Sequence, residues 1–120
     1  MNKNSPETFH QKLQTLMYSF VHSVYDATKT FPGDEIFGVT SQLRRATLSV
    51  ALNYTEGYAR HGKRELAHFL KISYGSLKES MYLVQFAKDR EWISLETHQK
   101  LYQMGDEIGK MLWSSFSHMT

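Results

Sequence analysis

Two groups of side chains in this sequence have the chemistry to bind or transform a ligand. One is a set of arginines and lysines, whose charged groups bind phosphates and carboxylates. The other is the pair Glu65 and His68, spaced as Glu-x-x-His. Di-iron helical bundles hold their metals with two such pairs and two further glutamates. The same spacing occurs at Glu7 and His10, but the remaining histidines form no ligand pattern, so we expect neither a metal nor any other cofactor.

The arginines and lysines gather in two places. Arg44 and Arg45 are adjacent, so on a helix they point roughly 100° apart and at most one faces straight inward. Each has two interpretations, contact with a phosphate or a structural pairing with a carboxylate such as Glu56 or Glu79. The second place is the span 60–78, where one glutamate accompanies five basic residues. These five are the best candidates for contact with RNA or DNA: Arg60, Lys63, Arg64, Lys71 and Lys78.

Enzymatic chemistry has little support. No nucleophile–base pair accompanies Glu56, and the absence of cysteine excludes disulfides, iron–sulfur clusters and thiol nucleophiles. The net charge of +2 is too small to argue alone for a polyanionic partner. The sequence has neither a signal-like apolar run at its start nor a segment of bilayer length. We therefore expect a cytoplasmic protein that is not an enzyme and has no membrane partner.

Four helices must position these groups. Apolar residues recur at steps of three and four, which predicts helices at about 6–29, 41–61, 63–90 and 95–116. Pro32 and Gly33 end the first periodic segment, Gly62 ends the second, and the connector REWIS precedes the fourth. Strand-like alternation is absent. The predicted fold is all-α, a single domain over residues 1–120 that forms an up-down antiparallel four-helix bundle.

Capping residues mark where these helices begin. Ser5 and Pro6 are the expected N-cap and first position of the first helix. Thr40 or Ser41 is the expected cap of the second, and Ser94 that of the fourth.

Two patterns predict that the bundle associates with copies of itself. The predicted helices contain four internal glycines, each costing roughly 1 kcal/mol against alanine, which suggests close packing: Gly57, Gly75, Gly105 and Gly109. Several apolar residues lie off the inward stripes: Leu48, Leu52, Ile72, Tyr82, Phe86 and Trp113. A bundle that is apolar on more than one face usually buries the excess against other subunits.

The second helix also has a polar C-terminal half. Asn53 and Glu56 lie three residues apart and therefore share a helical face, and Gly57 adjoins them. A buried Glu56 would need an arginine from the same or the next subunit. We interpret these three residues, together with Gly75 and Glu79, as structural or subunit-interface positions.

Three blocks of sequence resemble a known family. They are FGVTSQLRRA, 37–46; NYTEG, 53–57; and FLKISYGSLKE, 69–79. TFPGDE and EIGKML, at 30–35 and 107–112, fit as well. In order and spacing these blocks resemble the four-helix bundle family of 23S rRNA intervening-sequence proteins. The chain departs from that family at Ala51, where SVALNYTEG replaces a common SIPANIAEG, so the second helix should lack a proline kink.

This resemblance implies a homo-oligomer, a pentameric ring of bundles without known catalytic activity. The same fold includes the accessory variability determinant of diversity-generating retroelements, a basic pentameric barrel that works with a reverse transcriptase and nucleic acid. Two functions follow as hypotheses. The first is a noncatalytic scaffold that binds RNA or a ribonucleoprotein through a basic surface. The second is a protein-interaction accessory subunit, such as a partner of a reverse transcriptase or another nucleic-acid enzyme.

Overall fold

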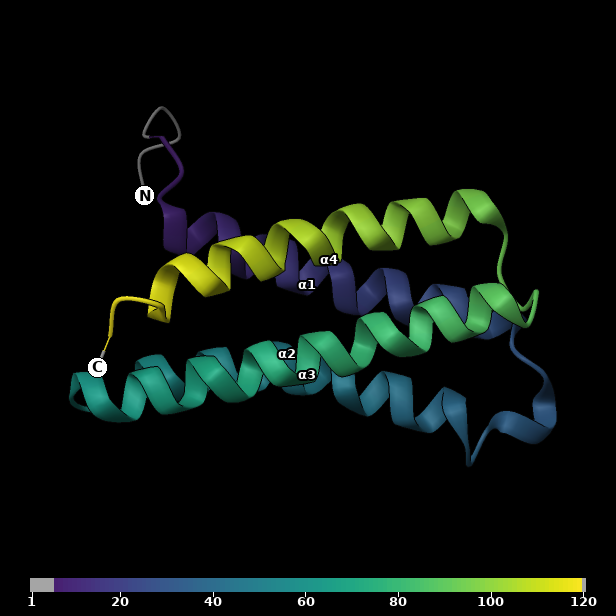
Figure 1. Ribbon diagram of the computed structural model, residues 1–120, viewed down its shortest axis with the longest axis horizontal. Helices are drawn as coiled ribbons and strands as arrows, with labels where there is room; N and C mark the ends of the chain where they lie inside the picture. The colour runs from purple at the N-terminus through teal and green to yellow at the C-terminus, as the bar shows by residue number, and fades with distance from the viewer. Residues whose placement is uncertain (1–5, 120) are drawn as a thin grey trace.

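The computed structural model describes residues 6–119 and folds them into four α-helices without strands. The helices are α1 (Phe9–Ala27), α2 (Val39–Ala59), α3 (Lys63–Asp89) and α4 (Leu95–Phe116), with two short 3-10 helices between α1 and α2. Consecutive helices run in opposite directions (Figure 1). Each packs on two neighbours: α2 lies on α1 and α3, and α4 lies on α3 and α1. The all-helical fold with four helices is therefore confirmed.

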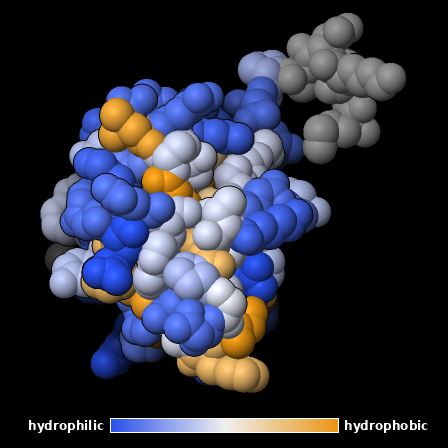
Figure 2. Space-filling model, turned by 90° about the vertical axis from the view of Figure 1, so that its right-hand side faces the viewer, coloured by the Kyte–Doolittle hydropathy of each residue, from blue (hydrophilic) through white to orange (hydrophobic). Residues whose placement is uncertain are grey.

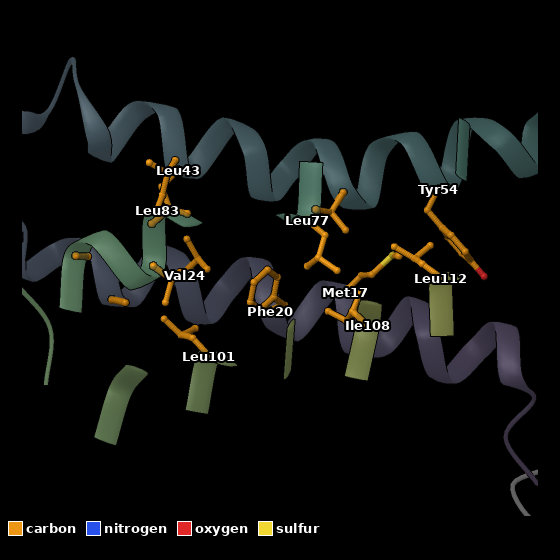
Figure 3. Packing of buried hydrophobic residues seen from close by; sticks show 14 of the residues in the cluster. Met17, Phe20, Val24, Leu43, Tyr54, Leu77, Leu83, Leu101, Ile108 and Leu112 are labelled. Atoms are coloured by element: carbon orange, nitrogen blue, oxygen red, sulfur yellow. The ribbon is translucent and has the colours of Figure 1, made fainter. Parts of the chain in front are cut away.

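Side chains from all four helices fill one core. Phe20 and Val24 of α1 lie opposite Leu43 of α2, Leu77 of α3 and other apolar residues of α3 and α4 (Figure 3). These side chains recur at helical spacing, which is why the sequence pattern predicted them. Helical spacing predicts an inward stripe for α2, and all its members are buried: Leu43, Ala46, Val50, Tyr54 and Gly57. The helix also runs unbroken through Ala51.

Two of the predicted helix starts are wrong. The first helix begins at Phe9, and Pro6 lies outside it, while Ser5 falls outside the described residues. A capping box explains the later start, because the Thr8 hydroxyl accepts from the amide of Gln11 at 3.0 Å while the Gln11 side chain accepts from the amide of Thr8.

The second helix starts before its expected cap. It begins at Val39, one residue ahead of Thr40, because the Glu35 carboxylate accepts from the Val39 amide at 3.1 Å. A carboxylate at this position also suits the positive end of the helix dipole. The helix ends at Ala59, two residues early, and Gly62 instead precedes α3 with a φ of 100°. The predicted cap of the fourth helix is confirmed, since the Ser94 hydroxyl accepts from the Thr97 amide at 3.0 Å.

The helical glycines differ in what surrounds them. A Cβ at Gly57 would lie 3.1 Å from the Phe69 Cβ and 3.2 Å from the Leu66 Cδ1, so this glycine lets α2 approach α3. Gly105 and Gly109 similarly face Met81 and Leu77 across the bundle. A Cβ at Gly75 would meet no described atom within 4 Å. Packing within the chain therefore explains three of the four glycines.

Alanine at Gly57 and at Gly75 should have opposite effects on stability. Gly75→Ala should raise the free energy of unfolding by about 0.5–1 kcal/mol, because alanine favours the helix and its methyl group meets nothing. Gly57→Ala should lower it, because the Phe69 Cβ is fixed to its own backbone and cannot yield easily. Urea unfolding followed by circular dichroism, at one protein concentration, measures both. Equal shifts of the two midpoints would contradict this account of the α2–α3 spacing.

Candidate nucleic-acid interface

Small polar side chains line the contact between α2 and α3. The Ser73 hydroxyl donates to the Val50 carbonyl across the two helices at 2.6 Å. The Thr47 hydroxyl donates to the Ser80 hydroxyl at 3.4 Å, and the hydroxyls of Ser49 and Ser76 lie 2.7 Å apart. We call this contact, with Gly57 at its end, the α2–α3 seam. Its small residues let the two backbones come close, while its hydrogen bonds satisfy polar groups that the contact buries.

The polar half of α2 has partners inside the chain. The Asn53 amide donates to the carbonyl and the hydroxyl of Ser49, at 2.9 and 2.8 Å. The carboxylate of Glu56, which is half exposed, pairs with Arg60 of the same chain at 2.8 Å. Glu56 is thus not the buried carboxylate that would have needed an arginine, and it pairs with the residue that caps the C-terminus of α2. These contacts give Asn53, Glu56 and Gly57 structural roles within one subunit.

Arg44 and Arg45 have separate surroundings. The Arg44 side chain donates from Nε to the Thr28 hydroxyl at 2.8 Å, and its guanidinium lies 4.7 Å from the centre of the Tyr25 ring. Of the two interpretations of Arg44, pairing with a carboxylate has no partner among the described residues, and the side chain instead joins α2 to the end of α1. Arg45 is exposed and forms no hydrogen bond or ion pair with the described residues. Of the two, Arg45 is the one whose charge is available to a ligand.

Arg45 lies at a pocket between α2 and α3 of about 490 Å³, which we call the α2–α3 pocket. Glu79 of α3 also lines it, and Gln42 donates to one oxygen of that carboxylate at 3.3 Å. The full lining is Phe37, Gly38, Ser41, Gln42, Arg45, Ala46, Ser49, Ser76 and Glu79. The fold therefore brings together two sequence blocks, 37–46 and 69–79, that lie on different helices. No signal in the sequence predicted that they would share a pocket.

The five basic residues of 60–78 do not form one cluster. Arg60 is held by Glu56, and its guanidinium lies 5.1 Å from the centre of the Phe69 ring. Arg64, Lys71 and Lys78 are seven residues apart on α3, so they share one face of that helix. All three are exposed, and none forms an ion pair with a described residue. We call these three residues the α3 stripe.

One member of the basic set remains, and one stripe residue has a further contact. Lys63 is exposed at the first position of α3. Lys78 also lies 5.1 Å from the centre of the Tyr74 ring, which holds its ammonium group over the helix. On the outward side of α3, Gly75 separates Lys71 from Lys78 and leaves the backbone bare.

A metal site finds no support among residues 6–119. In this part of the chain no group of three or more histidine and acidic residues is placed to hold a metal ion. His68 instead packs its ring edge against Phe69, with ring centres 5.3 Å apart. None of the four described helices is long and apolar enough to cross a membrane.

The apolar residues predicted to lie off the core are exposed, as expected, with Tyr82 74% and Leu52 62% exposed. Leu48 and Leu52 line a groove of about 550 Å³ between α1 and α2, and Tyr18 and Val21 of α1 form its other wall. We call it the α1–α2 groove. The sequence pattern did not single out Tyr18, although it follows the buried Met17 and therefore points away from the core.

Phe37 is a second exposed aromatic residue that no sequence pattern singled out. Phe31, in the same connection between α1 and α2, is buried. Phe37, however, is 95% exposed. The end of the bundle that carries the α1–α2 connection is mainly hydrophilic, with separate hydrophobic patches at its rim (Figure 2).

A buried tyrosine closes the opposite end of the core. Tyr54 is only 1% exposed, and its hydroxyl shares a hydrogen bond of 2.7 Å with Nδ1 of His10. Burial and the neighbouring Tyr58 raise the pKa of Tyr54, so the hydroxyl stays protonated at neutral pH. The group fastens α1 to α2, which is a structural role.

The fold and this site define a small all-helical protein with exposed arginine and lysine side chains on α2 and α3. A family model described as 23S rRNA-intervening sequence protein matches residues 10–114. The chain therefore belongs to the family of 23S rRNA-intervening sequence proteins, as its sequence blocks predicted. A similar solved structure is that of a protein of unknown function from the S23 ribosomal protein family of Bacteroides thetaiotaomicron. Its TM-score is 0.84 at 18% identity, covering 92% of this chain and 99% of the other. Among curated proteins, none matches.

The two arginines provide a matched pair for mutation. Arg44→Ala should lower the free energy of unfolding by about 1–2 kcal/mol, because it removes a hydrogen bond and a cation–ring contact between α1 and α2. Arg45→Ala should change it by less than about 0.5 kcal/mol, as expected of an exposed side chain without partners. Chemical denaturation of both variants measures these two changes in the free energy of unfolding. A loss at Arg45 as large as that at Arg44 would show that Arg45 is structural as well.

Proposed function

We propose that this protein is a noncatalytic, homo-oligomeric scaffold of the cytoplasm that binds RNA or a ribonucleoprotein through the α3 stripe. The observation that carries the proposal is the stripe itself. Arg64, Lys71 and Lys78 face outward along one helix, and no acidic side chain among the described residues pairs with them. Unpaired cations in a row suit the regularly spaced charges of a phosphate backbone.

Self-association would strengthen this weak surface. Three cations release few counterions, but repeated copies in one assembly add their contributions. The exposed apolar residues on α2, α3 and α4 support self-association. The family resemblance suggests a pentameric ring, which would carry five copies of the stripe. The noncatalytic part of the proposal fits the lack of any nucleophile–base arrangement at the described site.

Charge reversal of the stripe tests the proposal. The triple variant Arg64→Glu, Lys71→Glu and Lys78→Glu should lose at least about 100-fold in affinity for RNA at moderate salt. For the unmodified protein, the logarithm of the association constant for RNA should fall linearly as the logarithm of the salt concentration rises. Fluorescence anisotropy of labelled RNA over a salt series measures both quantities.

A triple variant of equal charge change serves as the control. Lys29→Glu, Lys100→Glu and Lys110→Glu alter exposed lysines outside α3, and the two ion pairs lost at Lys29 and Lys110 are surface pairs of little energetic value. This control should keep most of the affinity. If both triple variants lose it equally, binding depends on net charge and the stripe has no special role.

The mass of the assembly tests self-association. Native mass spectrometry of protein purified without nuclease or high salt should show five copies of the chain with bound nucleic acid. A second preparation treated with nuclease should keep the five copies and lose the added mass. A monomer under both conditions would contradict the oligomeric part of the proposal.

The α1–α2 groove favours a second function, that of an accessory subunit which docks on a nucleic-acid enzyme such as a reverse transcriptase. The groove is apolar and its rim residues Tyr18 and Leu52 are exposed, which is typical of a protein-binding surface. This function predicts that reversal of the α3 stripe leaves partner binding intact, while Leu52→Glu abolishes it.

A further inference from the structure

Phe37 is held in the open by a well-defined turn. The Gly38 amide donates to the Glu35 carbonyl at 2.9 Å, and the Val39 amide donates to the Glu35 carboxylate at 3.1 Å. The aromatic ring is nevertheless 95% exposed, and it lies at the mouth of the α2–α3 pocket. A ring that a fixed turn presents to solvent is available as a stacking platform.

The walls of the α2–α3 pocket have unused hydrogen-bonding groups of both kinds. Arg45 has no partner among the described residues, and Glu79 accepts from Gln42 through only one of its two oxygens. Both residues line the pocket, yet they form no ion pair with each other. The pocket therefore offers a cationic donor and a carboxylate acceptor at separate places.

A nucleotide has the three features that this pocket can recognise. Its base is flat and stacks on aromatic rings, its phosphate binds arginine, and an exocyclic amino group donates to a carboxylate. We propose that the α2–α3 pocket binds one unpaired nucleotide of an RNA strand. The base stacks on Phe37, Arg45 contacts a phosphate, and Glu79 accepts from the amino group of the base. This proposal rests on the RNA-binding function above and adds the class of RNA, which is single-stranded.

The position of Gly75 connects the pocket to the α3 stripe. Gly75 lies between Lys71 and Lys78, and the next residue, Ser76, already lines the pocket. A side chain at position 75 would meet no described atom, so the bare backbone leaves room for a strand to lie against α3. Phosphates on the stripe would thus lead directly to the base in the pocket.

Glu79 gives the site a preference among bases. Cytosine, adenine and guanine carry an exocyclic amino group and uracil does not, so uracil would leave the carboxylate without its donor. Oligocytidylate should bind more tightly than oligouridylate. Glu79→Gln should reduce that preference, because a neutral amide can both donate and accept.

Anisotropy titrations with oligocytidylate, oligouridylate and a duplex RNA of equal length test the proposal. Phe37→Leu should weaken binding of oligocytidylate about ten-fold or more, because leucine is apolar but cannot stack like a ring. Binding of the duplex should change less than about two-fold. Phe37→Tyr, the matched control, keeps the ring and should keep the affinity. Unchanged oligocytidylate binding by Phe37→Leu would overturn the proposal.

Failure of the proposed function and failure of the nucleotide pocket would give different results. If the unmodified protein binds neither single-stranded nor duplex RNA, the proposed function itself fails. If it binds both equally through the α3 stripe, and Phe37→Leu and Glu79→Gln have no effect, only the nucleotide pocket fails.

A contact between subunits is the alternative occupant of the pocket, and it has its own readout. Sedimentation of Phe37→Leu without RNA should give the same assembly as the unmodified protein. A smaller assembly, with a loss of RNA affinity that follows the loss of subunits, would assign Phe37 to an interface between copies and overturn the proposal.

Discussion

The close approach of α2 and α3 is the constraint on which the rest of the structure depends. Two helices can lie this near only if the facing side chains are small, and the seam meets that condition with Gly57, Ser73, Ser80 and Thr47. The hydroxyls would be costly in such a place without partners, and each has one. Ser73 bonds the Val50 backbone across the helices. The seam therefore holds the two helices in one register.

That register determines what appears on the surface. Ser49 and Ser76 belong to the outer edge of the seam and also line the α2–α3 pocket. Since α2 carries Arg45 and α3 carries Glu79, the pocket exists only when the two helices keep their alignment. The same alignment turns the α3 stripe away from the core. Stability and the candidate site thus depend on the same few residues.

Local patterns explain how much of this could be predicted from sequence. Helical periodicity located the four helices and the inward stripe of α2, because burial repeats with the helix. Ser94 was identified as a cap because few residues nearby competed for that role. At the first helix the sequence does contain the capping-box spacing of Thr8 and Gln11, which competes with Ser5 before Pro6. At the second helix Glu35 caps from four residues before Val39, which no local pattern predicts.

The site was less predictable because its contacts join distant segments. The partner of Arg44 is a threonine at the end of the preceding helix, and charge pairing had suggested a carboxylate instead. Arg60 belongs to the basic set because of its position in the sequence, whereas in the fold it forms an ion pair with Glu56. Arg64 and Lys71 lie seven residues apart on α3, so helix spacing gives them a shared face, and the structure shows that both are exposed. Their function stays a proposal.

The Glu35 cap has a further consequence for recognition. It fastens the turn to the start of α2 through the Val39 amide, and the Gly38 amide also bonds the Glu35 carbonyl, so two hydrogen bonds hold the turn. A mobile loop would lose conformational entropy when its aromatic residue met a partner. In this protein the turn loses that conformational entropy when the chain folds, before it meets a partner. The binding proposed at Phe37 would therefore start from a preorganised surface, and its strength would depend on how firmly Glu35 holds the start of α2.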